Sequence, residues 1–230
     1  MGTKYLHGTI FRIPEESSEA HYQCIYREIF DLLIYDYNVC PLPSNGVVID
    51  VGSNVGMFAF YASVRKNNRF ICYEISPICI DAFNQNMALL PQRRRENIVL
   101  VSKGLWNESG RSSFIEYPEF SGCNHLVDVG VRRSENAREC PVELTTLDEE
   151  VERLQLKSVD FIKVDAEGSD KYVLEGAKNT IKQFKPRMAL SVYHLPNDEE
   201  EIFDLVKSIH DYKITIVNHT DVRIKIMYCY

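Results

Sequence analysis

The sequence predicts a doubly wound α/β fold, in which helices cover both faces of a mostly parallel sheet. Short apolar runs alternate with helical segments over residues 47–192, and a turn that contains Gly52 and Gly56 joins the first run to the first helical segment. The chain ends in two further strand-like runs. Strands that alternate with helices connect through right-handed crossovers, so we expect a parallel sheet with its ligand at the carboxyl ends of the strands.

The first 46 residues are expected to form an N-terminal helical annex. Apolar side chains recur at helical spacing over residues 18–37, with acidic residues between them, and a Pro-Leu-Pro-Ser-Asn-Gly stretch at residues 41–46 ends this pattern. A chain of 230 residues can bury one substantial core. We therefore predict one domain over residues 47–230.

The elements of that domain follow from its periodicity. Strands are expected at residues 47–51, 69–74, 98–101, 160–164 and 187–192, and helices at 57–66, 78–90 and 170–184. Residues 114–142 break the rhythm with prolines, glycines and polar side chains, which predicts an insertion that is either an extra hairpin or a mobile lid. The final runs, 212–217 and 222–228, predict a C-terminal antiparallel hairpin with one solvent-exposed face.

Charge and cysteine content limit the partners and the cellular compartment that we expect. A net charge of −7 disfavours an extended nucleic-acid surface, so we expect no nucleic-acid partner. The seven cysteines form no Cys-x-x-Cys pair, and we expect small buried thiols rather than a redox or zinc motif. The start lacks the apolar stretch of a signal peptide, and no segment is apolar and long enough to span a bilayer. These features predict a cytoplasmic protein.

The turn after the first strand predicts a cofactor site. It contains Asp50, Gly52, Ser53, Asn54 and Gly56. Glycines allow close approach of a ligand to the backbone, and the following helix offers unpaired N–H groups. The pattern is neither the Gly-x-Gly-x-x-Gly of dinucleotide sites nor the Gly-Lys-Ser/Thr of phosphate loops.

An acidic residue follows the second strand. A carboxylate at the position of Glu74 can accept hydrogen bonds from both hydroxyls of a ribose. Asp50 could orient the loop or bind the ammonium group of an amino-acid-like cofactor. Together, the turn and Glu74 favour a nucleoside-bearing cofactor over a purely structural turn.

Three segments resemble the FkbM-type methyltransferases, a branch of the class I enzymes that use S-adenosylmethionine. They are Asp-x-Gly-x-Asn-x-Gly at residues 50–56, Glu74, and Phe-Ile-Lys-Val-Asp-Ala-Glu-Gly at residues 161–168. The likeness runs from about Val47 to the final hairpin, and Lys-x-Asp-x-Glu-Gly is its most specific part. The resemblance implies a Rossmann-like, seven-stranded sheet with a reversed last strand.

The resemblance also implies roles for individual residues. The loop residues Asp50, Gly52, Ser53, Asn54 and Gly56 would hold the methionine part of S-adenosylmethionine, and Glu74 its ribose. Lys103, Gly104 and Leu105 would border the adenine, and Asp165 would lie next to the cofactor. The sequence departs from the family at Ser53, often alanine, and at Ser-Val-Tyr-His (residues 191–194), where many members carry a glutamate.

Transfer of a methyl group to a neutral hydroxyl also requires a proton acceptor. His194 follows the fifth strand, and its imidazole suits this role near neutral pH, so we predict it as the general base. Asp165 and Glu167 would position the acceptor or share that role. The three side chains could also hold a divalent cation, although their spacing does not require one.

The family's members mostly methylate hydroxyls of sugars, polyketides and related metabolites. The resemblance thus implies an O-methyltransferase that acts on a sugar hydroxyl in a glycan or nucleotide sugar, for example a deoxyhexose such as rhamnose. An enzyme for a small phenolic or polyketide metabolite is the alternative. A non-catalytic nucleoside-binding scaffold is a third reading, against which the intact loop and acidic residues argue. Nothing in the sequence indicates the oligomeric state.

Overall fold

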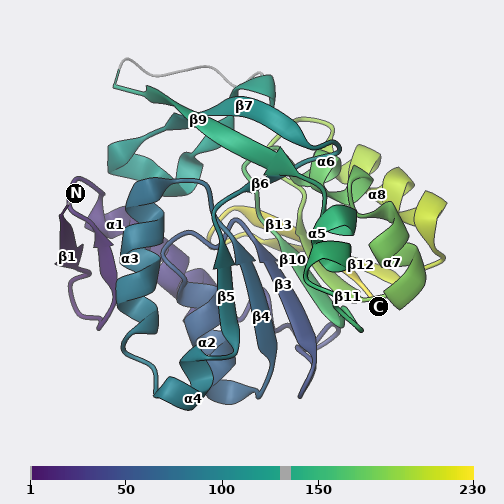
Figure 1. Ribbon diagram of the computed structural model, residues 1–230, viewed down its shortest axis with the longest axis horizontal. Helices are drawn as coiled ribbons and strands as arrows, with labels where there is room; N and C mark the ends of the chain where they lie inside the picture. Colours follow the sequence, from purple (N-terminus) through teal and green to yellow (C-terminus); the bar gives the residue numbers. More distant parts are fainter. Residues whose placement is uncertain (1, 130–135) are drawn as a thin grey trace.

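The computed structural model describes residues 2–129 and 136–230 of the chain. Its central sheet has seven strands in the order β12-β13-β11-β10-β3-β4-β5. This confirms the doubly wound α/β fold (Figure 1). The strands are β3 (Val47–Val51), β4 (Arg69–Tyr73), β5 (Ile98–Val101), β10 (Phe161–Val164), β11 (Arg187–Ser191), β12 (Ile214–His219) and β13 (Ile224–Cys229).

One strand of the sheet is reversed. The five strands from β5 to β11 are parallel to one another, whereas β13 is antiparallel to both β11 and β12. The predicted C-terminal antiparallel hairpin is therefore confirmed. Its second strand, β13, lies between β11 and β12 and is the reversed strand that the resemblance implies.

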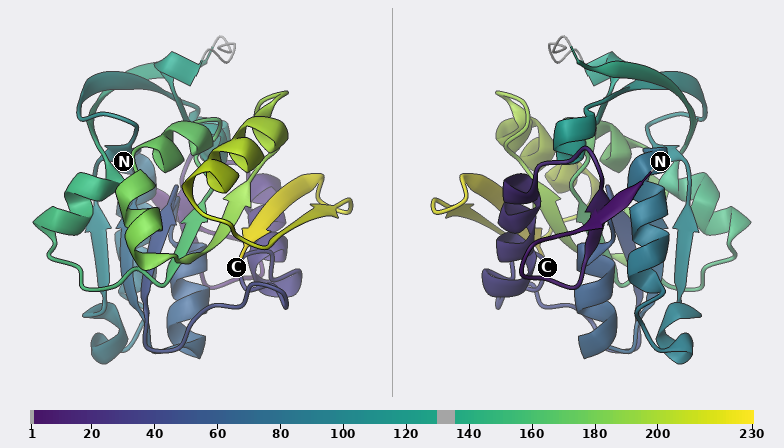
Figure 2. Two further views of the ribbon diagram at one scale, coloured as in Figure 1. Left: turned by 90° about the vertical axis from the view of Figure 1, so that its right-hand side faces the viewer. Right: turned by 90° about the vertical axis from the view of Figure 1, so that its left-hand side faces the viewer.

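Helices cover both faces of this sheet, as the views from either side show (Figure 2). Neighbouring strand residues point in opposite directions, so Val48 packs in one apolar core and Ile49 in the other. The first core contains α1 (Glu19–Tyr26), α2 (Met57–Arg65) and α3 (Pro77–Met87). The second contains α5 (Leu147–Arg153), α6 (Asp170–Glu175), α7 (Lys178–Phe184) and α8 (Asp198–Ile209). A short helix, α4 (Gln92–Arg95), precedes β5.

Two predicted helices are shorter in the structure. The helix expected over residues 170–184 is divided into α6 and α7 at Gly176, where a side chain would collide with the carbonyl oxygen of Trp106 at 2.0 Å. The helix expected over residues 18–37 continues from α1 as a π-helical turn, η1 (Arg27–Asp31), and ends before Leu33, whose φ of 54° is left-handed. This early end directs Ile34 and Tyr35 into the protein.

The N-terminal segment packs against the sheet domain. A two-stranded sheet of β1 (Thr3–Tyr5) and β2 (Arg12–Pro14) precedes α1, and Phe11, Ile13 and Tyr22 share the first core with α2 and α3. Asn86 of α3 binds the backbone of Arg12 through both its oxygen and its nitrogen. The boundary at residue 46 stays a prediction.

A second sheet lies over the carboxyl ends of the central strands (Figure 1). Of the two alternatives for residues 114–142, the described part favours the hairpin, because β7 pairs with β9 along seven residue pairs. Its middle, residues 130–135, lies outside the described residues. The second sheet comprises β6 (Gly104–Leu105), β9 (Arg138–Thr145), β7 (Gly110–Glu116) and β8 (His125–Leu126), with the 3₁₀ turns η2 (Pro118–Cys123) and η3 (Val127–Val129).

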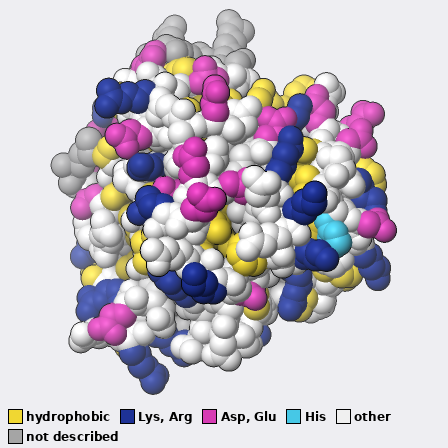
Figure 3. Space-filling view, turned by 45° about the vertical axis from the view of Figure 1, so that its right-hand side comes forward, with side chains coloured by type: hydrophobic (Ala, Val, Ile, Leu, Met, Phe, Trp, Pro, Cys, Tyr) yellow, Lys and Arg dark blue, Asp and Glu magenta, His cyan; other side chains and the backbone are white. Residues whose placement is uncertain are grey.

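The described helices include none with the length and apolarity to cross a membrane. On the face drawn in Figure 3, Lys and Arg side chains are interspersed with Asp and Glu. The absence of a nucleic-acid partner stays a prediction.

Candidate functional site

A cavity opens where β3, β4 and β10 end and the second sheet covers them. Most of the residues predicted from the sequence line it, and three do not: Asp50, Gly56 and His194 lie behind its wall. The predicted lining residues are Gly52, Ser53, Asn54, Glu74, Lys103, Gly104, Leu105, Asp165 and Glu167. The parallel strands therefore bring these separate segments to one place.

The glycine turn needs its glycines. Gly52 has a φ of 72°, and a side chain there would meet the backbone oxygen of Asp165 at 1.9 Å. Gly56 has a φ of 82° and packs against Phe83 and Met87 of α3. Gly52 thus lets the turn after β3 pass close to the chain after β10, and Gly56 lets α2 begin against α3.

The Glu74 carboxylate binds backbone N–H groups of the glycine turn and of the chain that follows β4. Its Oε2 accepts a hydrogen bond from the N–H of Asn54 at 2.8 Å, and its Oε1 accepts from the N–H groups of Ile75 and Ser76, both at 2.9 Å. Burial raises the pKa of Glu74, although these three N–H groups act to lower it. The carboxylate is therefore fixed in position at the cavity wall.

Asn54 links the turn to the N-terminal segment. Its Oδ1 accepts hydrogen bonds from the hydroxyl of Tyr22 at 2.8 Å and from the N–H of Val55 at 2.7 Å. The Tyr22 hydroxyl also lies 2.7 Å from the Ser121 hydroxyl in the second sheet's η2 turn. Tyr22 therefore connects the annex, the turn and the insertion.

Asp50 pairs with a buried lysine. The ammonium of Lys163 lies 3.0 Å from Asp50 Oδ1, and it donates hydrogen bonds to the backbone oxygens of Val51 and Gly52. The charges are in contact, but neither carboxylate oxygen of Asp50 has a well-directed hydrogen bond from the described residues. Burial acts to lower the pKa of Lys163, but the nearby carboxylates Asp50 and Asp165 raise it overall. Of the two roles predicted for Asp50, this arrangement favours orientation of the loop.

Asp165 is held by three side chains. Its Oδ2 accepts a hydrogen bond from the Tyr35 hydroxyl, and its Oδ1 accepts one from the Ser191 hydroxyl, both at 2.8 Å. His194 Nε2 lies 3.4 Å from the same Oδ1. Burial acts to raise the pKa of Asp165, but His194 and Lys163 lower it overall, so this carboxyl group is ionised.

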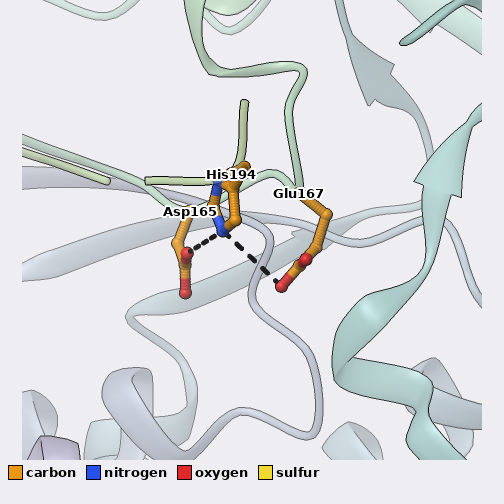
Figure 4. A group of neighbouring side chains, drawn as sticks. All are labelled: Asp165, Glu167 and His194. Carbon is orange, nitrogen blue, oxygen red and sulfur yellow. Dashed lines mark ion pairs between the residues drawn. The ribbon is translucent and has the colours of Figure 1, made fainter. Parts of the chain in front are cut away.

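His194 lies among three carboxylates. Its Nδ1 is 2.9 Å from Asp170 Oδ2, and its Nε2 faces Asp165 and Glu167, with Glu167 Oε1 at 3.7 Å (Figure 4). Burial acts to lower the pKa of His194, but Asp170, Asp165 and Glu167 raise it well above its ordinary value. Burial raises the pKa of Glu167 to about 8. Repulsion from Asp165 and Asp170 adds to this effect, whereas attraction to His194 acts against it.

These carboxylates affect the protonation state of His194, the predicted general base. An imidazole among three carboxylates favours its protonated form, so the ligand-free cluster holds a proton near neutral pH. The role of His194 as the general base stays a prediction. Strongly interacting groups exchange protons as a unit, so the titration belongs to the cluster of Asp165, Glu167 and His194 rather than to one member.

Several residues of the cavity wall carry no recognisable signal in the sequence. The N-terminal segment contributes His21, Glu28 and Tyr35, and the chain after β11 contributes Tyr193. No local pattern distinguishes these from ordinary amphipathic positions. Asp170 had one signal, because an acidic residue in the first turn of a helix often accepts backbone N–H groups; here it accepts those of Ala166 and Gly168.

Several known proteins with similar sequences are named as methyltransferases. The chain is 28% identical over 185 residues to methyltransferase sdnD from Sordaria araneosa, a match that covers 69% of this chain and 70% of that protein. It is 28% identical over 138 residues to hexuronic acid methyltransferase AglP from Haloferax volcanii, covering 59% and 52%. It is 23% identical over 241 residues to 31-O-demethyl-FK506 methyltransferase FkbM from Streptomyces tacrolimicus, covering 91% and 90%.

The fold is similar to that of a solved FkbM methyltransferase from Methylobacillus flagellatus. The TM-score is 0.65 at 20% sequence identity, and the match covers 84% of this chain but 46% of that longer one. Residues 50–219, which contain the glycine turn, the acidic residues and most of the sheet, match the Methyltransferase FkbM domain. This match spans most of the sequence, and the chain therefore belongs to the FkbM family of methyltransferases.

Proposed function

We propose that this methyltransferase uses S-adenosylmethionine to methylate a sugar hydroxyl, in a glycan or a nucleotide sugar. The observation that carries the proposal is the single cavity that joins the turn at Gly52, the fixed carboxylate of Glu74 and the acidic pair of Asp165 and Glu167. The first two suit the methionine and ribose parts of the cofactor. Lys103, Gly104 and Leu105, at the same wall, suit the adenine.

The reaction needs alignment and one proton acceptor. Bound S-adenosylmethionine would supply the methyl group, and in-line attack by the acceptor oxygen would form the C–O bond while the electron pair of the broken C–S bond stays on sulfur. The hydroxyl proton passes to the cluster of Asp165, Glu167 and His194, whose members exchange protons as a unit. Tyr35 and Ser191 hold Asp165 in place during the transfer.

Unsatisfied polar atoms in the cavity wall favour a hydroxyl-rich acceptor. Among the described residues, His21 Nε2, Asn124 Nδ2 and His125 Nε2 are buried without a hydrogen-bond partner, and all three residues line the cavity. His125 Nδ1 lies 3.1 Å from the backbone oxygen of Cys123, so its Nε2 can accept a hydrogen bond. Buried polar groups of this kind need partners, which sugar hydroxyls provide. The similarity to a hexuronic acid methyltransferase also supports a sugar.

A polyketide or phenolic acceptor is the second candidate. Ile25, Ile29 and Phe58 add apolar surface to the cavity, and one relative is named for the macrocycle FK506. We keep the cytoplasm as the proposed compartment because all seven cysteines are free thiols.

Mass spectrometry of two acceptor panels with labelled S-adenosylmethionine tests the proposal. One panel contains glycans and nucleotide sugars, and the other contains phenols and polyketides. Label on a sugar that Asp165→Asn abolishes supports the proposal, and label on the second panel alone replaces it with the second candidate. Cofactor binding by calorimetry without transfer to either panel would indicate a non-catalytic scaffold.

A further inference from the structure

Three side chains of types that can coordinate a metal ion lie close together (Figure 4). One ligand atom each from Asp165, Glu167 and His194 lies within 4.8 Å of the other two. His194 Nε2 is 3.4 Å from Asp165 Oδ1 and 3.7 Å from Glu167 Oε1. Carboxylate and imidazole ligands lie about 2.0–2.2 Å from a metal ion, which places adjacent ligand atoms roughly 3.0–3.6 Å apart. The two distances from His194 Nε2 are thus close to the spacing that an ion requires.

The histidine provides an independent observation. The His194 side chain is only 6% exposed, and its Nε2 has no hydrogen-bond partner among the described residues. A buried nitrogen without a hydrogen bond is costly, yet this one points between two carboxylates. An ion at that position would satisfy it.

From this geometry we propose that Asp165, Glu167 and His194 bind a first-row divalent metal ion such as Mn²⁺ or Zn²⁺. The chemical meaning of the site rests on the proposed function, because a bound ion would polarise the acceptor hydroxyl. Ion binding itself needs neither cofactor nor acceptor. One imidazole beside two carboxylates suits such ions better than Mg²⁺, which prefers oxygen ligands alone.

A neighbouring carboxylate supports the histidine in this role. Metal-binding histidines commonly use their second nitrogen to contact a carboxylate, which fixes the ring and its tautomer. Asp170 Oδ2 lies 2.9 Å from His194 Nδ1, and the backbone N–H groups of Ala166 and Gly168 hold the Asp170 carboxylate. With an ion bound, Nδ1 would therefore keep its proton, and Nε2 would release its own and present its lone pair to the ion.

The site is also accessible from the cavity. The side chains of Asp165 and Glu167 are 25% and 29% exposed, and both line the cavity wall. The described carboxyl groups around this position, Glu28 and Asp170 besides Asp165 and Glu167, outnumber the two cationic side chains, Lys163 and His194. A divalent cation would bind there in exchange for protons of the cluster.

The test is metal binding by the full chain after EDTA treatment and dialysis, without cofactor or acceptor. Calorimetry with Mn²⁺ and Zn²⁺, and electron paramagnetic resonance of Mn²⁺, should detect one site, with weaker binding of Mg²⁺. His194→Gln and Glu167→Gln should each weaken binding at least tenfold. Asp170→Asn should weaken it about 10–100-fold, as loss of a supporting carboxylate does. His219→Gln, in the terminal hairpin, is the matched control and should bind normally.

Absence of binding to the unmodified chain, or unchanged binding in both His194→Gln and Glu167→Gln, would overturn the inference. Circular dichroism checks folding; if His194→Gln does not fold, the result for Glu167→Gln decides, because that side chain is partly exposed. The two proposals fail separately. Ion binding without any methyl transfer would overturn only the proposed function. Methyl transfer by a chain that binds no ion would overturn only the proposed metal site.

Discussion

Asp50 and Lys163 are register partners on the adjacent parallel strands β3 and β10, and their side chains form a fully buried ion pair of 3.0 Å. The pair lies against the turn that bears Gly52, because the Lys163 ammonium also donates to the Gly52 backbone oxygen. Lys163 therefore couples the two strands whose ends form the cavity. Its loss would leave the Asp50 charge buried without a partner.

Lys163→Met should accordingly lower the free energy of unfolding by about 3–5 kcal/mol, the cost of breaking a buried ion pair. Asp50→Asn in the same chain should recover part of that loss, since the uncompensated charge disappears. Urea denaturation of the two single variants and the double variant measures the coupling. Additive effects of the two substitutions would show that the pair does not act as a unit.

Gly52→Ala should destabilise the protein by about 2–6 kcal/mol, because it combines a left-handed backbone with a collision against the Asp165 backbone oxygen. Gly110→Ala is the control, since nothing lies within 4 Å of the position that its side chain would occupy. Thermal unfolding monitored by circular dichroism compares them. Equal melting temperatures would contradict the close approach of the turn to the chain after β10.

Glu74→Gln should weaken S-adenosylmethionine binding at least tenfold, about 1.4 kcal/mol. The amide keeps the size of the carboxylate, but it removes the charge and turns one acceptor into a donor that faces a backbone N–H group. Calorimetry with S-adenosylmethionine gives the affinity, and the exposed Glu108→Gln serves as the control. Unchanged affinity would exclude Glu74 from the cofactor site.

Glu28→Gln should change how stability depends on pH. Burial, together with repulsion from Asp165 and Glu167, raises the pKa of Glu28 to about 8. A carboxyl group whose pKa is higher in the folded state stabilises the fold below its unfolded pKa, and that contribution is lost as the pH rises to about 8.

The Glu28→Gln variant has no such group to ionise. Its stability relative to the unmodified chain should therefore rise between pH 5 and pH 8 by at least about 1.4 kcal/mol, the equivalent of one pKa unit. Urea denaturation with EDTA at both pH values measures the difference. The prediction would be refuted if the difference in unfolding free energy between the two proteins were the same at both pH values. Such a constant difference is expected for the exposed Glu152→Gln.

Local sequence determined the main architecture of this protein. Apolar runs of strand length alternate with helical periodicity, and this local signal predicts the doubly wound sheet. The number of seven strands comes from the family resemblance. The local signal also placed Gly52, Glu74, Asp165 and Glu167 at one edge, because the carboxyl ends of parallel strands meet there whatever the loops do. The alternating terminal run likewise predicted the reversed strand, β13.

Tertiary contacts decided the rest, because they join residues that are distant in the sequence. The left-handed Leu33 ends the first helix and brings Tyr35 to Asp165, 130 residues away. The helix that periodicity alone would continue divides at Gly176, which lies against the Trp106 backbone. The sequence suggested His194 as a reactive group, but only the folded chain surrounds it with Asp165, Glu167 and Asp170. Its charge state depends on those neighbours, and no local pattern contains them.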